Sequence, residues 1–118
     1  MQPRIVRAKT LRETRSSERC FIAENWSSQK LSVARATVKP GDTTVLHHLE
    51  DVDEIYLIVK GKGKVNVGKL EPTNVEKGDT VFIPAGISQQ ITNFGETDLV
   101  FYCICSPRFT QRCYISEE

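Results

Sequence analysis

Turn-forming residues divide this sequence into short segments, and that division limits what the chain can fold into. Glycine and proline recur at Pro40-Gly41-Asp42, Gly61-Lys62-Gly63, Lys77-Gly78-Asp79, Pro84-Ala85-Gly86 and Gly95-Glu96. The segments between these turns are rich in β-branched and aromatic residues, and no window of about eleven residues keeps the apolar spacing of an amphipathic helix. Short strands separated by turns every 8–12 residues or so are typical of a β-sandwich or barrel. The sequence therefore predicts an all-β fold with two layers.

The expected strands can be placed between the turns. They cover residues 20–23, 31–39, 43–49, 54–60, 64–67, 80–83, 88–93, 98–105 and 111–115. The segment 98–105 is apolar on both faces, whereas a strand of a small barrel usually shows one face to water. A second surface is expected to cover its outer face, and a homodimer with two-fold symmetry is the simplest arrangement that does so.

Size and charge restrict the function. The 118 residues predict a single domain, and the net charge of +1 gives no overall field that would draw the chain to nucleic acid or to a membrane. Residues 1–19 carry six basic and two acidic side chains, which predicts a basic N-terminal arm in front of a barrel at 20–118. The four cysteines show neither a C-x-x-C pair nor a zinc-binding spacing, so we expect thiols and a cytoplasmic location.

Two blocks within residues 41–93 share a notable spacing. The first has Gly41, then His47, Glu54 and Gly61 after gaps of five, six and six residues, and the second runs from Gly78 to Asn93. These blocks resemble the two motifs of the cupin superfamily, in particular its small single-domain members with a conserved barrel. The resemblance covers about half of the chain and implies a double-stranded β-helix, or jelly-roll, barrel.

The same resemblance implies a degenerate metal site. The first cupin motif supplies two histidines and a glutamate, and the second supplies a third histidine. Here His47 and Glu54 stand at their expected positions, but Leu49 and Gln89 replace the other two imidazoles. His47, Glu54 and Gln89 would hold a divalent metal such as Fe, Mn, Ni or Zn only weakly, and a cavity without metal is the alternative. His48 could substitute only if a bulge turned it inward, because strand alternation points it away from His47.

Other residues are candidates for the wall of the same cavity. Leu49 shares a strand face with His47, Tyr56 with Glu54, and Asn93 with Gln89. Phe82 and Tyr56 could stack on a ligand ring or belong to the core. Arg35, if it points inward, would favour a carboxylate or phosphate ligand, and otherwise it is an ordinary surface residue.

The functional interpretation keeps several alternatives open. The resemblance implies a cupin-type protein that binds a small polar or acidic molecule. With a metal, it would be an isomerase, dioxygenase or lyase in which Glu54 acts as ligand or base; without one, it would be a non-catalytic ligand-binding or sensor protein. A third alternative is a scaffold with a side-chain-filled interior, whose dimer surface is its function. Whether the protein is an enzyme is left undecided by the sequence.

Overall fold

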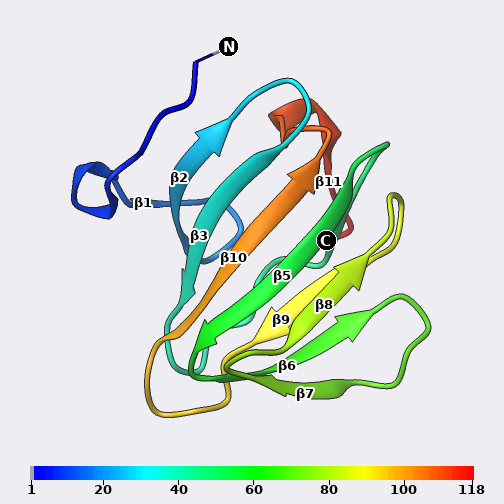
Figure 1. The fold of residues 1–118 in the computed structure, drawn as a ribbon. Coiled ribbons are helices and arrows are strands. Elements are labelled where there is room, and N and C mark those ends of the chain that lie inside the picture. Colours follow the sequence, from blue (N-terminus) through cyan, green and yellow to red (C-terminus); the bar gives the residue numbers. More distant parts are fainter. Residues whose placement is uncertain (1) are drawn as a thin grey trace.

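Two antiparallel β-sheets make up the computed structural model, which describes residues 2–118 (Figure 1). The larger sheet has the strand order β1 (Thr14–Arg15), β2 (Phe21–Ser27), β3 (Ser32–Val38), β10 (Leu99–Ser106), β5 (Asp53–Lys60) and β8 (Thr80–Ile83). The smaller sheet has the order β11 (Tyr114–Ser116), β4 (His47–Leu49), β9 (Gln89–Thr92), β6 (Lys62–Val67) and β7 (Thr73–Glu76). The predicted all-β fold with two layers is confirmed.

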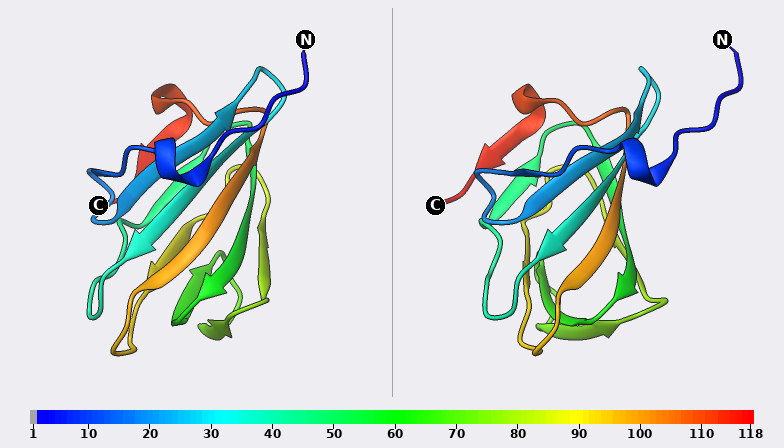
Figure 2. Two further views of the ribbon diagram at one scale, coloured as in Figure 1. Left: turned by 60° about the vertical axis from the view of Figure 1, so that its left-hand side comes forward. Right: turned by 90° about the vertical axis from the view of Figure 1, so that its left-hand side faces the viewer.

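The sheets form opposite walls of a barrel (Figure 2). Side chains alternate along the strands, so that Tyr56 and Ile58 of β5 are buried while Leu57 between them is exposed. The main core lies toward one end of the barrel and contains apolar residues of both sheets: Ala36, Val38, Ile58, Val65, Ile91, Leu99 and Phe101. Small or polar residues occupy the facing positions toward the other end of β3, β5 and β10, and this leaves space there.

Strand register determines which side chains meet at that less filled end. Cys105 of β10 pairs with Ser32 of β3 on one side and with Glu54 of β5 on the other. In the smaller sheet, His47 of β4 lies opposite Gln89 of β9. Paired residues point to the same side of a sheet, so all five face the space between the two sheets.

One tight turn shows why the chain needs glycine where it does. Gly61, between β5 and β6, has φ of +82°, and a Cβ atom there would lie 2.5 Å from the carbonyl oxygen of Asp98. Both the left-handed backbone and the close approach exclude a side chain.

Several predicted boundaries differ from the structure. The strand expected at 43–49 is ordered as β only from His47, with Thr43 forming an isolated bridge to Thr92. The segment 111–115 begins as a 3-10 helix, η2 (Gln111–Cys113), before β11. Neither β1 nor β7 was expected from the sequence. All four cysteines are free thiols, and no helix among residues 2–118 has the length and apolarity that a membrane crossing requires.

The basic segment before residue 20 runs along β2. It contains one short 3-10 helix, η1 (Ala8–Thr10), and then β1 pairs with β2. The Arg4 guanidinium lies 5.3 Å from the ring centre of Trp26, and that of Arg15 lies 5.2 Å from the ring centre of Phe21. Cation–π contacts of this kind hold the segment against the barrel. Met1 lies outside the described residues.

Candidate functional site

A cavity of about 350 Å³ opens between the two sheets at the less filled end of the barrel. Its walls come from β2, β3, β4, β5 and β10, together with the segments around Glu18 and Phe109. Most of the wall is apolar, with Ile22, Leu49 and Phe101 among its larger side chains. The volume is enough for a small organic molecule, so the interior is not filled by side chains as the scaffold alternative required.

Glu54 is the buried acid of this cavity, with 6% of its surface exposed. Its Oε2 accepts a hydrogen bond from the Cys105 thiol at 3.5 Å, whereas its Oε1 has no hydrogen-bond partner. Burial raises the pKa of Glu54 to about 7, and the nearby Gln89 amide and Cys105 and Cys103 thiols oppose that rise. The carboxyl group is therefore close to half protonated at neutral pH, and one of its oxygens is buried and unsatisfied within the protein.

His47 presents a single lone pair to the cavity. Its Nδ1 lies 2.7 Å from the Val45 carbonyl oxygen, which can only accept, so Nδ1 carries the proton. The ring stacks on Tyr114 with centroids 4.6 Å apart. Burial lowers the pKa of His47, and the neutral ring leaves Nε2 as an acceptor. That nitrogen lies 3.7 Å from Oε1 of Glu18.

Gln89 has its amide oxygen engaged within the protein. The Tyr56 hydroxyl donates a hydrogen bond to Gln89 Oε1, and both side chains are buried. The three predicted metal ligands thus lie close together. Among them, only the His47 imidazole nitrogen and the Glu54 carboxyl group are free to bind a metal. No group of three or more His, Cys, Asp or Glu placed to hold a metal occurs within residues 2–118. The donor set does not fit a metal centre, which needs more ligands of this kind.

Glu18 is a cavity residue that the sequence did not point to, since it was counted only among the charges of the basic segment. Its side chain is 23% exposed and faces His47 from the loop that enters β2. Burial, and then the charge of Glu54, raise the pKa of Glu18 to about 7. Two carboxyl groups and one imidazole nitrogen therefore border the same space.

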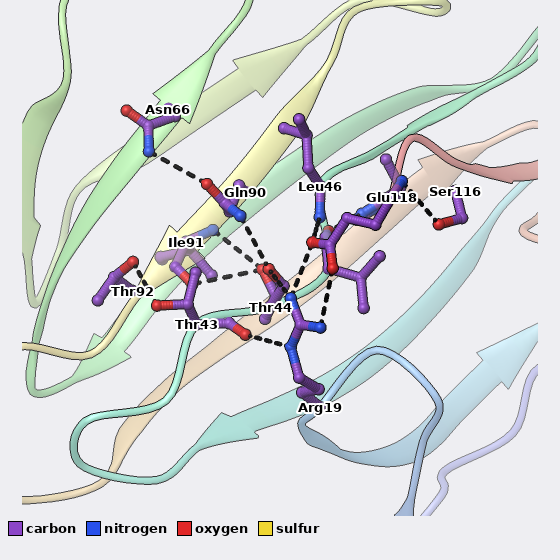
Figure 3. A network of polar contacts seen from close by, with 12 residues as sticks. Arg19, Thr43, Thr44, Leu46, Asn66, Gln90, Ile91, Thr92, Ser116 and Glu118 are labelled. Carbon is purple, nitrogen blue, oxygen red and sulfur yellow. Dashed lines mark hydrogen bonds and ion pairs between the residues drawn. The ribbon is translucent and has the colours of Figure 1, made fainter.

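The position of Glu18 depends on its neighbour Arg19, which has a positive φ of 66°. The Arg19 guanidinium donates to both carboxylate oxygens of Glu118, at 2.9 and 2.8 Å, and to the carbonyl oxygens of Thr43 and Thr44 (Figure 3). Glu118 in turn accepts a hydrogen bond from the Leu46 amide at 2.8 Å. This network ties the loop before β2 to Glu118 and to the segment before β4. In both views of Figure 2 the C-terminus lies near this loop.

The structure places Leu49 and Tyr56 in the cavity wall, as strand alternation suggested, but not Arg35 or Phe82. Arg35 lies on the outer face of β3, with its guanidinium 3.8 Å from the Glu13 carboxylate. The small residues of β3 face inward instead, because the cavity takes the space that larger side chains would fill. Phe82 is 57% exposed on the outer face of β8.

Two further candidates serve the fold rather than the cavity. Asn93 is fully buried, and its amide donates to the carbonyl oxygens of Val38 and Thr97, both at 2.8 Å. His48 points away from the cavity, and its Nδ1 lies 2.8 Å from Glu117 Oε2. No bulge turns it inward, so β4 keeps the regular alternation.

The charged residues in the cavity wall are all acidic. Glu18, Glu24 and Glu54 line it, and no lysine or arginine does. Its thiols are neutral, because burial raises the pKa of Cys20 to about 11 and that of Cys103 well above its ordinary value. Nothing in the wall supplies a fixed positive charge to an anionic ligand.

Comparison with known proteins places this geometry in a family. The family model described as the cupin domain matches residues 34–105. An uncharacterized protein of Methanocaldococcus jannaschii is 36% identical over 81 residues, which are 69% of this chain and 64% of that protein. An oxalate-binding protein of Thermotoga maritima is 39% identical over 72 residues, 60% of this chain and 58% of that protein. The chain thus spans less than two thirds of the length of these relatives.

Solved structures agree with the sequence comparisons. The crystal structure of a predicted oxalate decarboxylase from Thermotoga maritima superposes with a TM-score of 0.80 at 27% identity, covering 88% of this chain and 99% of that chain. The likeness to double-stranded β-helix structures confirms the jelly-roll barrel predicted from the motifs.

Proposed function

Because this chain belongs to the cupin family, we propose that it binds a small polar molecule in the barrel cavity. One observation carries the proposal: Oε1 of Glu54 is buried in a cavity wall without a hydrogen-bond partner. An unsatisfied buried polar group costs about 1–3 kcal/mol, and a ligand that hydrogen-bonds to it removes that cost. The oxalate-binding relative supports small-molecule binding as the class of function, but not its ligand.

The wall of the cavity does not favour the acidic ligand that the sequence left open. Arg35, which would have favoured a carboxylate or phosphate had it pointed inward, is paired with Glu13 on the outer face. Without a lysine or arginine in the wall, a carboxylate or phosphate would face Glu54 and Glu18 with no compensating charge.

The metal-dependent alternative, an isomerase, dioxygenase or lyase that uses Glu54, is the second candidate. The family resemblance favours it, and the donor set opposes it, because Leu49 offers no ligand atom and the Gln89 oxygen is engaged by Tyr56. We therefore favour ligand binding without metal. Elemental analysis of the purified protein, followed by loading with Fe, Mn, Ni or Zn, distinguishes the two: stoichiometric metal bound through His47 would reverse this preference.

A thermal-shift screen of small neutral, basic and acidic compounds tests the proposal. A ligand present at a hundred times its dissociation constant adds about 2.7 kcal/mol to the free energy of unfolding. Ala34→Leu is the matched variant, since Ala34 lines the cavity and a larger side chain would occupy it. We expect a compound to stabilise the wild type and not this variant. If no compound of any class shifts the melting temperature, or if the shifts survive Ala34→Leu, the proposal is wrong.

The assembly and the location remain predictions. Val33, Ile104, Ile55 and Phe82 pair in one row across the outer face of the larger sheet, and this apolar row supports the predicted homodimer. Sedimentation measurements on the wild type and on Phe82→Ser would test it. We keep the cytoplasm as the expected location, and we expect neither nucleic acid nor membrane as a partner.

A further inference from the structure

The cavity has a charge that the rest of the chain does not share. Sixteen basic residues balance fifteen acidic ones in the sequence, yet the charged side chains of the cavity wall are all acidic. Glu54 and Glu18 border its interior, and Glu24 is exposed at its edge. Beside an apolar wall of low polarizability, the ionised forms of these acids act more strongly on a ligand than they would in water.

Three polar atoms of the acidic side chains and the histidine at the cavity share one chemical property. Glu54 Oε1 has no partner, His47 Nε2 is an unprotonated nitrogen, and Glu18 Oε1 lies 3.7 Å from that nitrogen. A carboxylate oxygen and an unprotonated imidazole nitrogen only accept hydrogen bonds. A ligand that fits such a group of atoms must bring donors, and an ammonium group brings three donors, a positive charge and no acceptor.

We propose that the cavity recognises its ligand through a basic nitrogen, which Glu54 and Glu18 bind as an ammonium group while His47 Nε2 accepts a third hydrogen bond. The inference rests on the proposed function and names the class of ligand for the same cavity. The ligand's hydrocarbon part then contacts the apolar wall formed by Ile22, Leu49 and Phe101. A compact organic amine has both features.

The loop that carries Glu18 is fixed in a way that suits recognition. Arg19 uses its whole guanidinium on Glu118 and on two backbone carbonyls, so it is turned away from the cavity and does not neutralise Glu18. The adjacent acid is thereby held at the cavity while its basic neighbour is kept out. A preorganised charge of this kind binds with a smaller loss of side-chain entropy than a mobile one.

Three probes with the same ring test the proposal: cyclohexylamine, cyclohexanol and cyclohexanecarboxylate. Binding would be measured by isothermal calorimetry and by the shifts of backbone amide signals at Leu49 and Phe101 in NMR titrations. We expect the amine to bind and the carboxylate not to bind. Glu54→Gln and Glu18→Gln should each weaken amine binding by about tenfold or more, since hydrogen bonds to charged groups contribute the most. Glu96→Gln, which alters an exposed turn, is the matched control and should bind as the wild type does.

Each other outcome has a definite meaning. If the carboxylate or the alcohol binds as well as the amine, the assignment of a basic ligand is overturned while small-molecule binding stands. If the amine binds but both glutamine variants bind it equally, the two acids do not recognise it and the proposal is also overturned. Tighter binding of Mn²⁺ or Ni²⁺ alone, abolished in Glu18→Gln, would show a metal site instead. Binding of no probe and of no compound in the wider screen would overturn the proposed function as well.

Discussion

Replacement of Glu54 by glutamine should change how the stability of the barrel depends on pH. Glutamine has the shape of the carboxylic acid and cannot ionise, so the packing around Cys105 and Gln89 is preserved. The structure raises the pKa of Glu54 from 4.5 to about 7, chiefly through burial. This change in ionisation is therefore the property that the substitution removes.

The sign and size of the effect follow from the two pKa values. Below pH 4.5 the carboxyl group is protonated in both the folded and the unfolded chain. Between pH 4.5 and 7 the unfolded chain releases this proton while the folded chain retains it, so the free energy of unfolding of the wild type falls as the pH rises. A rise from 4.5 to about 7 corresponds to about 3 kcal/mol, fully lost above pH 7. The glutamine variant has no proton to release at this position and does not show this loss.

Urea unfolding at pH 5 and at pH 8, followed by the fluorescence of the single tryptophan, Trp26, measures the difference. The stability of Glu54→Gln relative to the wild type should increase by about 2.5 kcal/mol between these two values of pH, because part of the change lies below pH 5. Glu96→Gln is exposed and should run parallel to the wild type. If Glu54→Gln also runs parallel, Glu54 ionises freely in the folded protein, and the argument for a buried, unsatisfied acid fails.

The remaining predictions concern the frame around the site. Gly61→Ala should lower the free energy of unfolding by about 1 kcal/mol or more, because of the left-handed backbone and the close Asp98 carbonyl, and the urea midpoint measures it. Asn93→Ala should cost roughly 2 kcal/mol, since the buried carbonyl group of Val38 and the partly buried one of Thr97 lose their donor. Unchanged thermal unfolding would show that water replaces the amide. Arg19→Ala should weaken cyclohexylamine binding, because it releases the loop that carries Glu18 while Glu18 itself is kept. An unchanged affinity in calorimetry would refute the positioning role of Arg19.

Strand alternation predicted much of the cavity wall because it is a local property. It placed Leu49 and Tyr56 on the inner faces, and it gave His48 the outward direction that the structure shows. The same rule left the inner face of β3 undecided, since Arg35 and the small residues beside it occupy alternate positions. Packing against the opposite wall decides that question, and this depends on residues from distant strands.

Glu18 escaped prediction for a different reason. It precedes the first expected strand, so no alternation applies to it, and its place in the cavity depends on the neighbouring Arg19. The partner of Arg19 is Glu118, which lies 99 positions further along the chain. A short-range pattern contains no information on a contact of that length, and Glu18 therefore looked like one more charge of a basic segment.

The substitutions at the motif positions are best understood through the charge that Glu54 must balance. A buried carboxyl group can be neutralised by a metal ion, by a protein cation, by a proton or by a cationic ligand. Leu49 and Gln89 remove the donors that a metal would need, and no lysine or arginine reaches the cavity. A proton and a basic ligand remain, and they compete for the same oxygen atoms. Measurement of the Glu54 pKa by carbon NMR with and without cyclohexylamine would show that competition directly, because a bound ammonium group must lower the pKa of Glu54.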